Sequence, residues 1–324
     1  MPPFGSNGGG INSNGGGTLT VTNSVISGNN SGGSQGWGGG LLLSGGGTLT
    51  VTNSIIINNS SGSGGGIYAD GGIVTVSNST ISGNLGVCNA GGGMGTNNAQ
   101  LTVMNRTISG NVANNGGAFC GPRSHGGGIA CFGSGTLTVT NSTISGNSVE
   151  AVPGGSNDGG GVYNAATLAV TNSTFSDNSA FQSQGGAIMN MGEATIGDTV
   201  LNAVVNGGTI TNAGTVTSLG YNLASDDGGG VLTGPGDQIN TDPMLGPLQD
   251  NGGPTFTHAL LPGSPAIDAG DPSFTPPPSR DQRGCPFARV FNGRIDVGSF
   301  EAQPPVPPCP TRPRPTPHPR PSPP

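Results

Sequence analysis

The sequence predicts an all-β solenoid of about 8–10 coils, with an irregular cap and a disordered tail after it. Two repeated patterns predict this fold. The unit TLTVTNSTISGN at 136–147 returns in close copies that start at Thr18, Thr48, Ile73, Gln100 and Thr167. A glycine-rich start, mostly GGG before an aliphatic residue, begins at residues 8, 38, 64, 91, 126, 159 and 185. The resulting intervals of 26 to 35 residues suit the coils of a repeat protein, in which each unit contacts only its neighbours.

The composition favours the same architecture. Glycine supplies 65 of the 324 residues, roughly three times its ordinary share, without the every-third-residue period of collagen. Charged residues make up 8% of the chain, which argues against a solvated disordered polymer. Because only 4% of the residues are aromatic, we expect a thin core that runs continuously through the coils.

Each coil contains three predicted strands. The first follows the glycines, the second is TLTVT, and the third is TIS. Residues of TLTVT alternate as a strand with one buried face requires. When the copies are stacked, three columns are apolar and are expected to point inward. They are Leu19/Leu49/Val74/Leu101/Leu137/Leu168, Val21/Val51/Val76/Val103/Val139/Val170 and Ile26/Ile56/Ile81/Ile108/Ile144/Phe175.

Two asparagine columns are equally regular and are expected at the corners of the coils. They are Asn23/Asn53/Asn78/Asn105/Asn141/Asn172 and Asn29/Asn59/Asn84/Asn111/Asn147/Asn178. Asparagine tolerates the left-handed backbone, and stacked amides can hydrogen-bond from coil to coil. We therefore assign both columns a structural role.

These repeats resemble the right-handed parallel β-helix superfamily of pectate-lyase-like proteins. They are most similar to the repeats of polymorphic outer membrane proteins, whose GGAI and FxxN signatures match Gly185–Ile188 and Phe175–Asn178. The resemblance covers residues 8–190, which are the regular coils. Residues 191–240 are read as degenerate coils that continue the β-helix, so the predicted domain spans 1–240.

The repeats differ in length at one place, between the ISGN corner and the next GGG. Insertions at one position per repeat lie on one edge of a solenoid, and such loops often carry function. We predict a ligand-binding edge there, with the candidate residues Trp37, Phe119, Arg123, His125, Glu150 and Asp158.

The C-terminal part changes character. Segments 242–254, 257–270, 281–284 and 293–301 resemble the choice-of-anchor Q module of bacterial surface proteins, which implies an exported or surface-attached protein. From the residues alone, 241–303 is expected to cover the open end of the solenoid. Residues 304–324 are rich in proline and are expected to be extended and disordered.

Charge and hydropathy limit the partners. The net charge is −7, lysine is absent, and most arginines come after residue 279, so no basic track for nucleic acid is present. No apolar run is long enough for a transmembrane helix. The N-terminus lacks the features of a signal peptide, and we expect that the start is truncated and that the protein is extracellular or on the cell surface.

Three functions are compatible with these patterns. The first is a non-catalytic adhesin or stalk that binds a glycan or a neighbouring cell. The second is a carbohydrate-active enzyme, because lyases of the resembling superfamily use acidic calcium ligands with an arginine or lysine base. The acids of the regular coils are scattered, at Asp70, Glu150, Asp158 and Asp177. The third is ice binding by the outward threonine columns.

No cofactor or catalytic residue is predicted. Acids gather after residue 225, where structural Ca²⁺ is possible, but their spacing matches no calcium loop. The five cysteines contain no CxxC pair, so zinc-ligand spacing is absent. A disulfide between Cys88 and Cys120 and free thiols are the two alternatives. Of the histidines, His125 with Cys120 and Cys131 could form a nucleophile–base pair, and surface exposure is the simpler interpretation.

Overall fold

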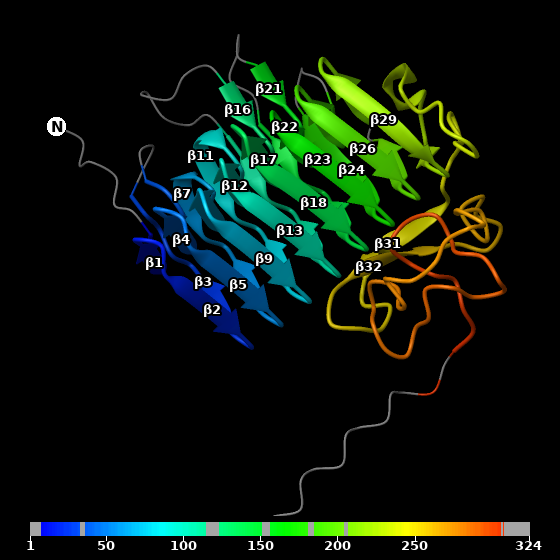
Figure 1. Cartoon of the computed structure of the whole chain (residues 1–324), viewed down its shortest axis with the longest axis horizontal. Helices are drawn as coiled ribbons and strands as arrows, with labels where there is room; N and C mark the ends of the chain where they lie inside the picture. Colours follow the sequence, from blue (N-terminus) through cyan, green and yellow to red (C-terminus); the bar gives the residue numbers. More distant parts are fainter. Residues whose placement is uncertain are drawn as a thin grey trace, which may run out of the picture.

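The computed structural model describes residues 8–32, 36–114, 123–150, 156–180, 185–203, 207–305 and 307. These residues form a parallel β-solenoid with an irregular C-terminal module beside it (Figure 1). The three strands predicted for each coil are present, and each pairs in parallel with its counterparts in the coils before and after it. The solenoid fold is therefore confirmed.

The first sheet has eight strands, each of which follows a glycine-rich start. They are β1 (Ile11–Asn14), β4 (Leu41–Ser44), β8 (Ile67–Asp70), β12 (Met94–Asn97), β17 (Ile129–Phe132), β22 (Val162–Asn164), β25 (Ile188–Asn190) and β28 (Ile210–Asn212). The second sheet also has eight strands and contains the TLTVT copies. They are β2 (Thr18–Thr22), β5 (Thr48–Thr52), β9 (Ile73–Ser77), β13 (Gln100–Met104), β18 (Thr136–Thr140), β23 (Thr167–Thr171), β26 (Glu193–Gly197) and β29 (Thr215–Gly220).

The third sheet contains the TIS copies and a further set of short strands. The TIS set is β3 (Val25–Ser27), β6 (Ile55–Ile57), β10 (Thr80–Ser82), β14 (Thr107–Ser109), β19 (Thr143–Ser145), β24 (Thr174–Ala180), β27 (Val200–Ala203) and β30 (Leu223–Ala224). The further set is β7 (Ser60–Ser63), β11 (Leu85–Ala90), β15 (Val112–Ala113) and β20 (Ser148–Val149). The long strand β24 pairs with both sets and joins them.

The three apolar columns form the core, as predicted. Leu49, Val51 and Ile56 are fully buried, and so are almost all of their counterparts. The copies of TLTVT pair residue by residue, Thr18 with Thr48 and Val21 with Val51, so each inward side chain lies directly on the next. Close stacking of like residues makes the core one continuous cluster from Val21 to Leu232.

The two asparagine columns have different roles. In the first, the backbone is left-handed, with φ between 49° and 55° from Asn23 to Asn172. In the second, the side chains form a ladder in which each Nδ2 donates to the Oδ1 of the next coil at 2.9–3.0 Å. Both columns are structural, as expected.

The C-terminal module does not lie where we expected it. The end of the solenoid beyond β28 is contacted by the 3₁₀ helix η2 (Gly228–Gly230) and by Leu232, which is part of the core cluster. The module formed by residues 241–303, including β31 (Leu245–Gln249) and β32 (Thr257–Leu260), instead packs along the flank (Figure 1). It covers the outer face of the third sheet from β14 to β30.

Hydroxyl groups hold the module to this flank. Thr107 donates a hydrogen bond to the carbonyl of Phe256, and Thr143 donates to Oε1 of Gln282 at 2.7 Å. The backbone N–H of Ser299 donates to Oγ1 of Thr174 at 3.0 Å. Val200 and Leu223 add an apolar contact with the module at the β30 end. The hydroxyls at the contact thus gain partners in the module in place of water.

Candidate functional site

The predicted ligand-binding edge is organised by two short strands outside the main sheets. Strand β16 (Arg123–His125) pairs in parallel with β21 (Ser156–Asp158), and this register sets His125 opposite Asp158. Nδ1 of His125 lies 3.7 Å from Oδ2 of Asp158. Two of the predicted residues, from consecutive coils, are thus brought together.

Aromatic side chains surround His125. Its ring stacks on Tyr163, with 4.1 Å between centroids and 25° between planes. The ring of Phe132 lies 5.3 Å from Tyr163 and 6.0 Å from His125. Phe132 and Tyr163 occupy outward positions of β17 and β22, next to the inward residues of the core, because side chains alternate along a strand. The three rings form one cluster on the outer face of the first sheet.

A second aromatic pair lies nearer the N-terminal end of the same face. Trp37 stacks on Tyr68 with 5.7 Å between ring centroids and 23° between planes, and 41% of the Trp37 surface is exposed. Tyr68 is an outward residue of β8 and is half-buried. Burial, together with the nearby Asp70 carboxylate, raises the pKa of the Tyr68 phenol, which therefore stays a neutral hydrogen-bond donor.

A polar pair lies between the two aromatic groups. Asp70 follows Tyr68 at the next outward position of β8, and Asn97 is its neighbour on β12. Nδ2 of Asn97 donates to Oδ1 of Asp70 at 2.9 Å. The next residue in this row is Phe132 on β17. We call Trp37, Tyr68, His125, Phe132 and Tyr163, together with this polar pair, the aromatic edge.

Three further residues were predicted for the ligand-binding edge, namely Glu150, Arg123 and Phe119. Glu150 is exposed directly after β20 and shares no ion pair within the described part of the chain. The backbone of Arg123 on β16 pairs with that of Ser156 on β21. Phe119 lies outside the described residues. The role of these six residues in binding stays a prediction.

Three aromatic residues of the edge were not predicted. Tyr68 and Tyr163 each follow the first inward residue after a GGG start, and Phe132 lies two positions beyond the equivalent place. The alternation along these strands makes all three positions outward. That signal was present in the sequence, in the second and fourth residues of each first strand.

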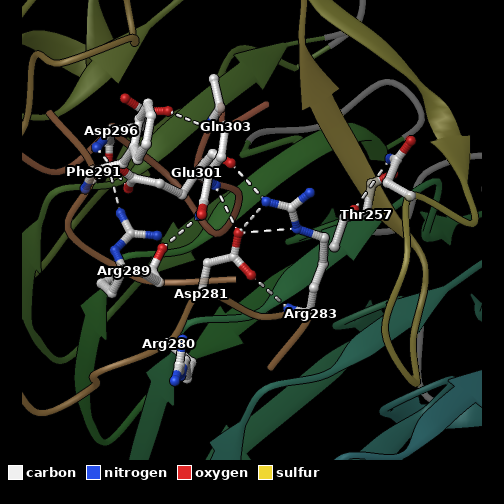
Figure 2. A network of polar contacts seen from close by, with 12 residues as sticks. Thr257, Arg280, Asp281, Arg283, Arg289, Phe291, Asp296, Glu301 and Gln303 are labelled. Carbon is white, nitrogen blue, oxygen red and sulfur yellow. Dashed lines mark hydrogen bonds and ion pairs between the residues drawn. The ribbon is translucent and has the colours of Figure 1, made fainter. Parts of the chain in front are cut away.

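Acids and arginines do gather closely, but inside the C-terminal module (Figure 2). Arg283 donates to Oδ2 of Asp281 from Nε at 2.9 Å and from Nη2 at 2.6 Å. The guanidinium lies between the rings of Phe287 and Phe300, 3.6 and 3.8 Å from their centroids. Asp281 is fully buried and Arg283 is 4% exposed, so this pair is closed to a polymeric substrate.

The remaining members of this network fix loops of the module. Glu301 accepts hydrogen bonds from the backbone N–H of Phe291 at 3.1 Å and of Asp296 at 3.0 Å (Figure 2). Nη2 of Arg289 donates to the carbonyl of Asp296. Burial raises the pKa of Glu301 to about 8, while the neighbouring Arg289 opposes that rise. These buried side chains thus bond to the backbone of the module's loops.

Comparison with known families agrees with the geometry. The family model described as a right-handed beta helix region matches residues 9–223, about two thirds of the chain. The chain belongs to the right-handed β-helix family. No curated protein and no solved structure matches it. The handedness that we predicted from resemblance is therefore shown.

The second sheet of the β-helix presents a threonine-rich outer face. Thr50, Thr75, Thr102 and Thr138 stand in line and are half-exposed. The row is interrupted by Ala169, beside a shallow depression whose lining includes Glu193 and Thr195. Ile73 and Met104 are exposed on the same face, so the array is not uniform.

Among the described residues, no group of three or more histidine, cysteine, aspartate or glutamate side chains could hold a metal ion. Cys88 and Cys285 are disulfide-bonded, and Cys131 is a free thiol in the core. Cys120, the predicted partner of Cys88, lies outside the described residues, so that pairing stays a prediction. No described helix is long and apolar enough to cross a membrane.

Proposed function

We propose that this protein is a non-catalytic, secreted or surface-attached β-helix that binds neutral glycans through its aromatic edge. The observation that carries the proposal is the exposed Trp37, which stacks on Tyr68 close to the polar pair Asp70 and Asn97. Sugar rings have apolar faces that pack on aromatic rings and hydroxyl groups that bond to carboxylate and amide oxygens. The aromatic edge offers both kinds of contact.

The spacing of the aromatic groups favours a chain of sugars over a single ring. Tyr68 on β8 and Phe132 on β17 are two strands apart in the first sheet. Two steps across a sheet span about 10 Å, which is longer than one sugar ring. An oligosaccharide that runs along the solenoid axis would contact Trp37, then the polar pair, and then the His125 cluster.

Charge at the edge favours a neutral ligand. Asp70 and Asp158 supply acidic groups there, and the whole chain lacks lysine. Like charges across an interface lower affinity, so uronic-acid polymers are disfavoured. The acidic groups also argue against the enzyme alternative, because the polysaccharide lyases of the superfamily that these repeats resemble act on acidic polysaccharides.

Extracellular placement is part of the proposal. Disulfide bonds persist in oxidising compartments and are rare in the cytosol, and Cys88 and Cys285 are both disulfide-bonded. A rigid solenoid that carries its binding groups on one edge suits a stalk or adhesin. Fractionation of the producing cells should place the protein outside the cytosol; recovery in the cytosol alone would contradict this part.

Isothermal titration calorimetry against neutral and uronic oligosaccharides tests the binding proposal. We expect a neutral oligosaccharide to bind, and Trp37→Ala to weaken its binding at least about tenfold, because a stacking aromatic anchor often contributes more than 1.4 kcal/mol. Phe256→Ala removes an aromatic ring that is 52% exposed on the C-terminal module, and serves as the control. Equal loss in both variants, or release of shortened sugar products, would contradict the proposal.

A further inference from the structure

One arginine of the β-helix is buried without a partner for its charge. Arg106 lies at the corner between β13 and β14, directly before Thr107, and is fully buried. Its Nη1 and Nη2 have no hydrogen-bond partner among the described residues. Nε makes only a long contact of 3.4 Å with the carbonyl of Met104. Two guanidinium nitrogens are therefore removed from water, and the protein offers no acceptor in its place.

No acidic side chain of the chain balances this charge. All 16 aspartate and glutamate residues belong to the described part of the chain, and the ion pairs found there do not include Arg106. Burial lowers the pKa of Arg106 well below its ordinary value, and no carboxylate opposes that shift. An arginine side chain nevertheless keeps its proton in proteins. A buried cation without a counter-charge is strongly unfavourable.

The other coils carry a hydroxyl group at this corner. The equivalent residues are Ser24, Ser54, Ser79, Ser142, Ser173 and Thr199. Each hydroxyl donates to the carbonyl two residues before it at 2.7–2.9 Å. Several also accept from the backbone N–H of the equivalent residue in the preceding coil, at 3.0–3.3 Å. A guanidinium has no acceptor, so Arg106 cannot receive that bond from Ser79. Packing of the corner therefore favours serine and does not explain arginine.

We propose that Arg106 binds a small inorganic anion of the halide class, such as chloride, which is enclosed with it at this corner. The anion accepts hydrogen bonds from Nη1 and Nη2 and neutralises the guanidinium, as charge-assisted hydrogen bonds do. Because both nitrogens are closed off by protein atoms, a monatomic anion requires the least displacement of the surrounding groups. Sugar acids and nucleotides are too large to be enclosed there.

The anion site lies where the C-terminal module docks. The backbone N–H of Thr143 donates to the carbonyl of Arg106 at 2.7 Å. The hydroxyls of Thr107 and Thr143 both donate to the module. The bound anion therefore holds a corner whose two neighbours make the contact with the module. It is a structural ligand, separate from the aromatic edge and independent of glycan binding.

Urea denaturation of the full chain in sodium chloride measures the proposed binding. The ionic strength is kept constant with sodium gluconate, whose anion is too large to be enclosed. A ligand that binds only the folded state raises the folding equilibrium constant about tenfold for each tenfold rise in its concentration well above the dissociation constant. We expect the unfolding midpoint of wild type to rise with chloride. Arg106→Ser restores the hydroxyl of the other coils and should not respond to chloride.

Arg280→Ser is the matched control, because it removes an exposed arginine from the C-terminal module. We expect this variant to keep the chloride response of wild type. A wild-type midpoint that stays constant when chloride replaces gluconate would overturn the proposal. A chloride response of equal size in Arg106→Ser would also overturn it.

Crystals grown in sodium bromide locate the anion directly. Bromide carries the same charge as chloride and scatters X-rays anomalously, so its position can be identified. We expect an anomalous difference peak within hydrogen-bonding distance of Nη1 or Nη2 of Arg106, and no peak at this corner in Arg106→Ser. Wild-type crystals that show bromide only at other places would contradict the proposal.

Discussion

Asn84 shows how a single corner residue joins three coils. It is fully buried, and its Nδ2 donates to the carbonyl of Ile56 at 3.0 Å and to Oδ1 of Asn111 at 2.9 Å. Its own Oδ1 accepts from the backbone N–H and the Nδ2 of Asn59, both at 3.0 Å. Every polar atom of the side chain is thus used, and no other residue type supplies the same donors and acceptors at this length.

Asn84→Ala should therefore destabilise the protein strongly. Each buried partner left without a hydrogen bond costs about 1–3 kcal/mol, and the substitution leaves several. Thr20→Ala changes an exposed outward side chain and should cost about 0.5 kcal/mol or less. Urea denaturation of both variants measures the difference. Similar midpoints for the two variants would show that the amide ladder contributes little.

His258 links the C-terminal module to the β-helix. Nδ1 lies 2.7 Å from the carbonyl of Gly246, and Nε2 lies 2.9 Å from Oγ of Ser145 on β19. A carbonyl can only accept, so Nδ1 carries the proton and Nε2 accepts from the serine hydroxyl. Burial lowers the pKa of His258 below 6.5, although the Asp177 carboxylate opposes the shift.

The contribution of His258 to stability should consequently fall as the pH drops below 6.5. The pKa of His258 is lower in the folded state than in the unfolded state, so the unfolded chain binds more protons in this range. The stability that neutral His258 contributes is fully present at a pH above its pKa in the unfolded state, and it is lost as the pH falls below that pKa. Asp198 and Glu301, whose pKa values burial raises to about 6 and about 8, have the opposite dependence. The free energy of unfolding of wild type minus that of His258→Gln isolates the histidine; a difference that is constant from pH 5 to 8 would contradict this assignment.

At the scale of the coil, the glycine-rich start allows neighbouring coils to approach closely. A Cβ at Gly65 would lie 2.5 Å from the carbonyl oxygens of both Gly92 and Leu85, which belong to rigid backbone. At Gly17, by contrast, nothing lies within 4 Å of a Cβ. Packing between coils therefore requires a glycine at Gly65, whereas no neighbouring atom requires one at Gly17.

Substitution of these two glycines should therefore have opposite outcomes. Gly65→Ala forces backbone apart between adjacent coils, and overpacking of this kind costs typically about 1–3 kcal/mol or more. Gly17→Ala should be neutral within about 0.5 kcal/mol. Melting temperatures from circular dichroism compare them directly. A melting temperature of Gly65→Ala equal to that of wild type would show that the coils can separate at little cost.

Most of the coil could be predicted from the sequence, because inward and outward side chains alternate along its strands. The inward columns at Val21, Leu49 and Ile56 follow from the period of two, and repetition of the unit aligns them. The fourth short strand, such as β7 or β11, could not be predicted, because it lies where the repeats differ in length and share no residue pattern.

For the whole molecule, the place of the C-terminal module could not be predicted. Thr107 and Thr143 are covered by the module, while Thr80 of the same column is half-exposed. All three belong to TIS copies, so the repeat itself does not distinguish a covered coil from an open one. The contact depends on Gln282 and His258, which lie far along the chain and carry no signal of their partner.

Some residues of the aromatic edge, namely Trp37 and His125, were singled out from the sequence. Length variation between the repeats pointed to one edge of the solenoid, and the structure brings His125 and Asp158 together there. The stack of Trp37 on Tyr68 joins residues 31 positions apart, and it requires the relative placement of two coils. Side-chain alternation alone indicates that Tyr68 faces outward, but not which ring it meets.

Fluorescence of Trp37 tests the glycan-binding proposal most directly, because it is the only tryptophan of the chain and stands at the proposed site. Titration with neutral oligosaccharides of increasing length should shift and saturate the emission, with affinity rising as the chain grows long enough to reach the His125 cluster. Tyr163→Ala should remove that gain for long chains and leave the affinity for short ones unchanged. Emission that stays constant with every neutral glycan that binds by calorimetry would contradict the account.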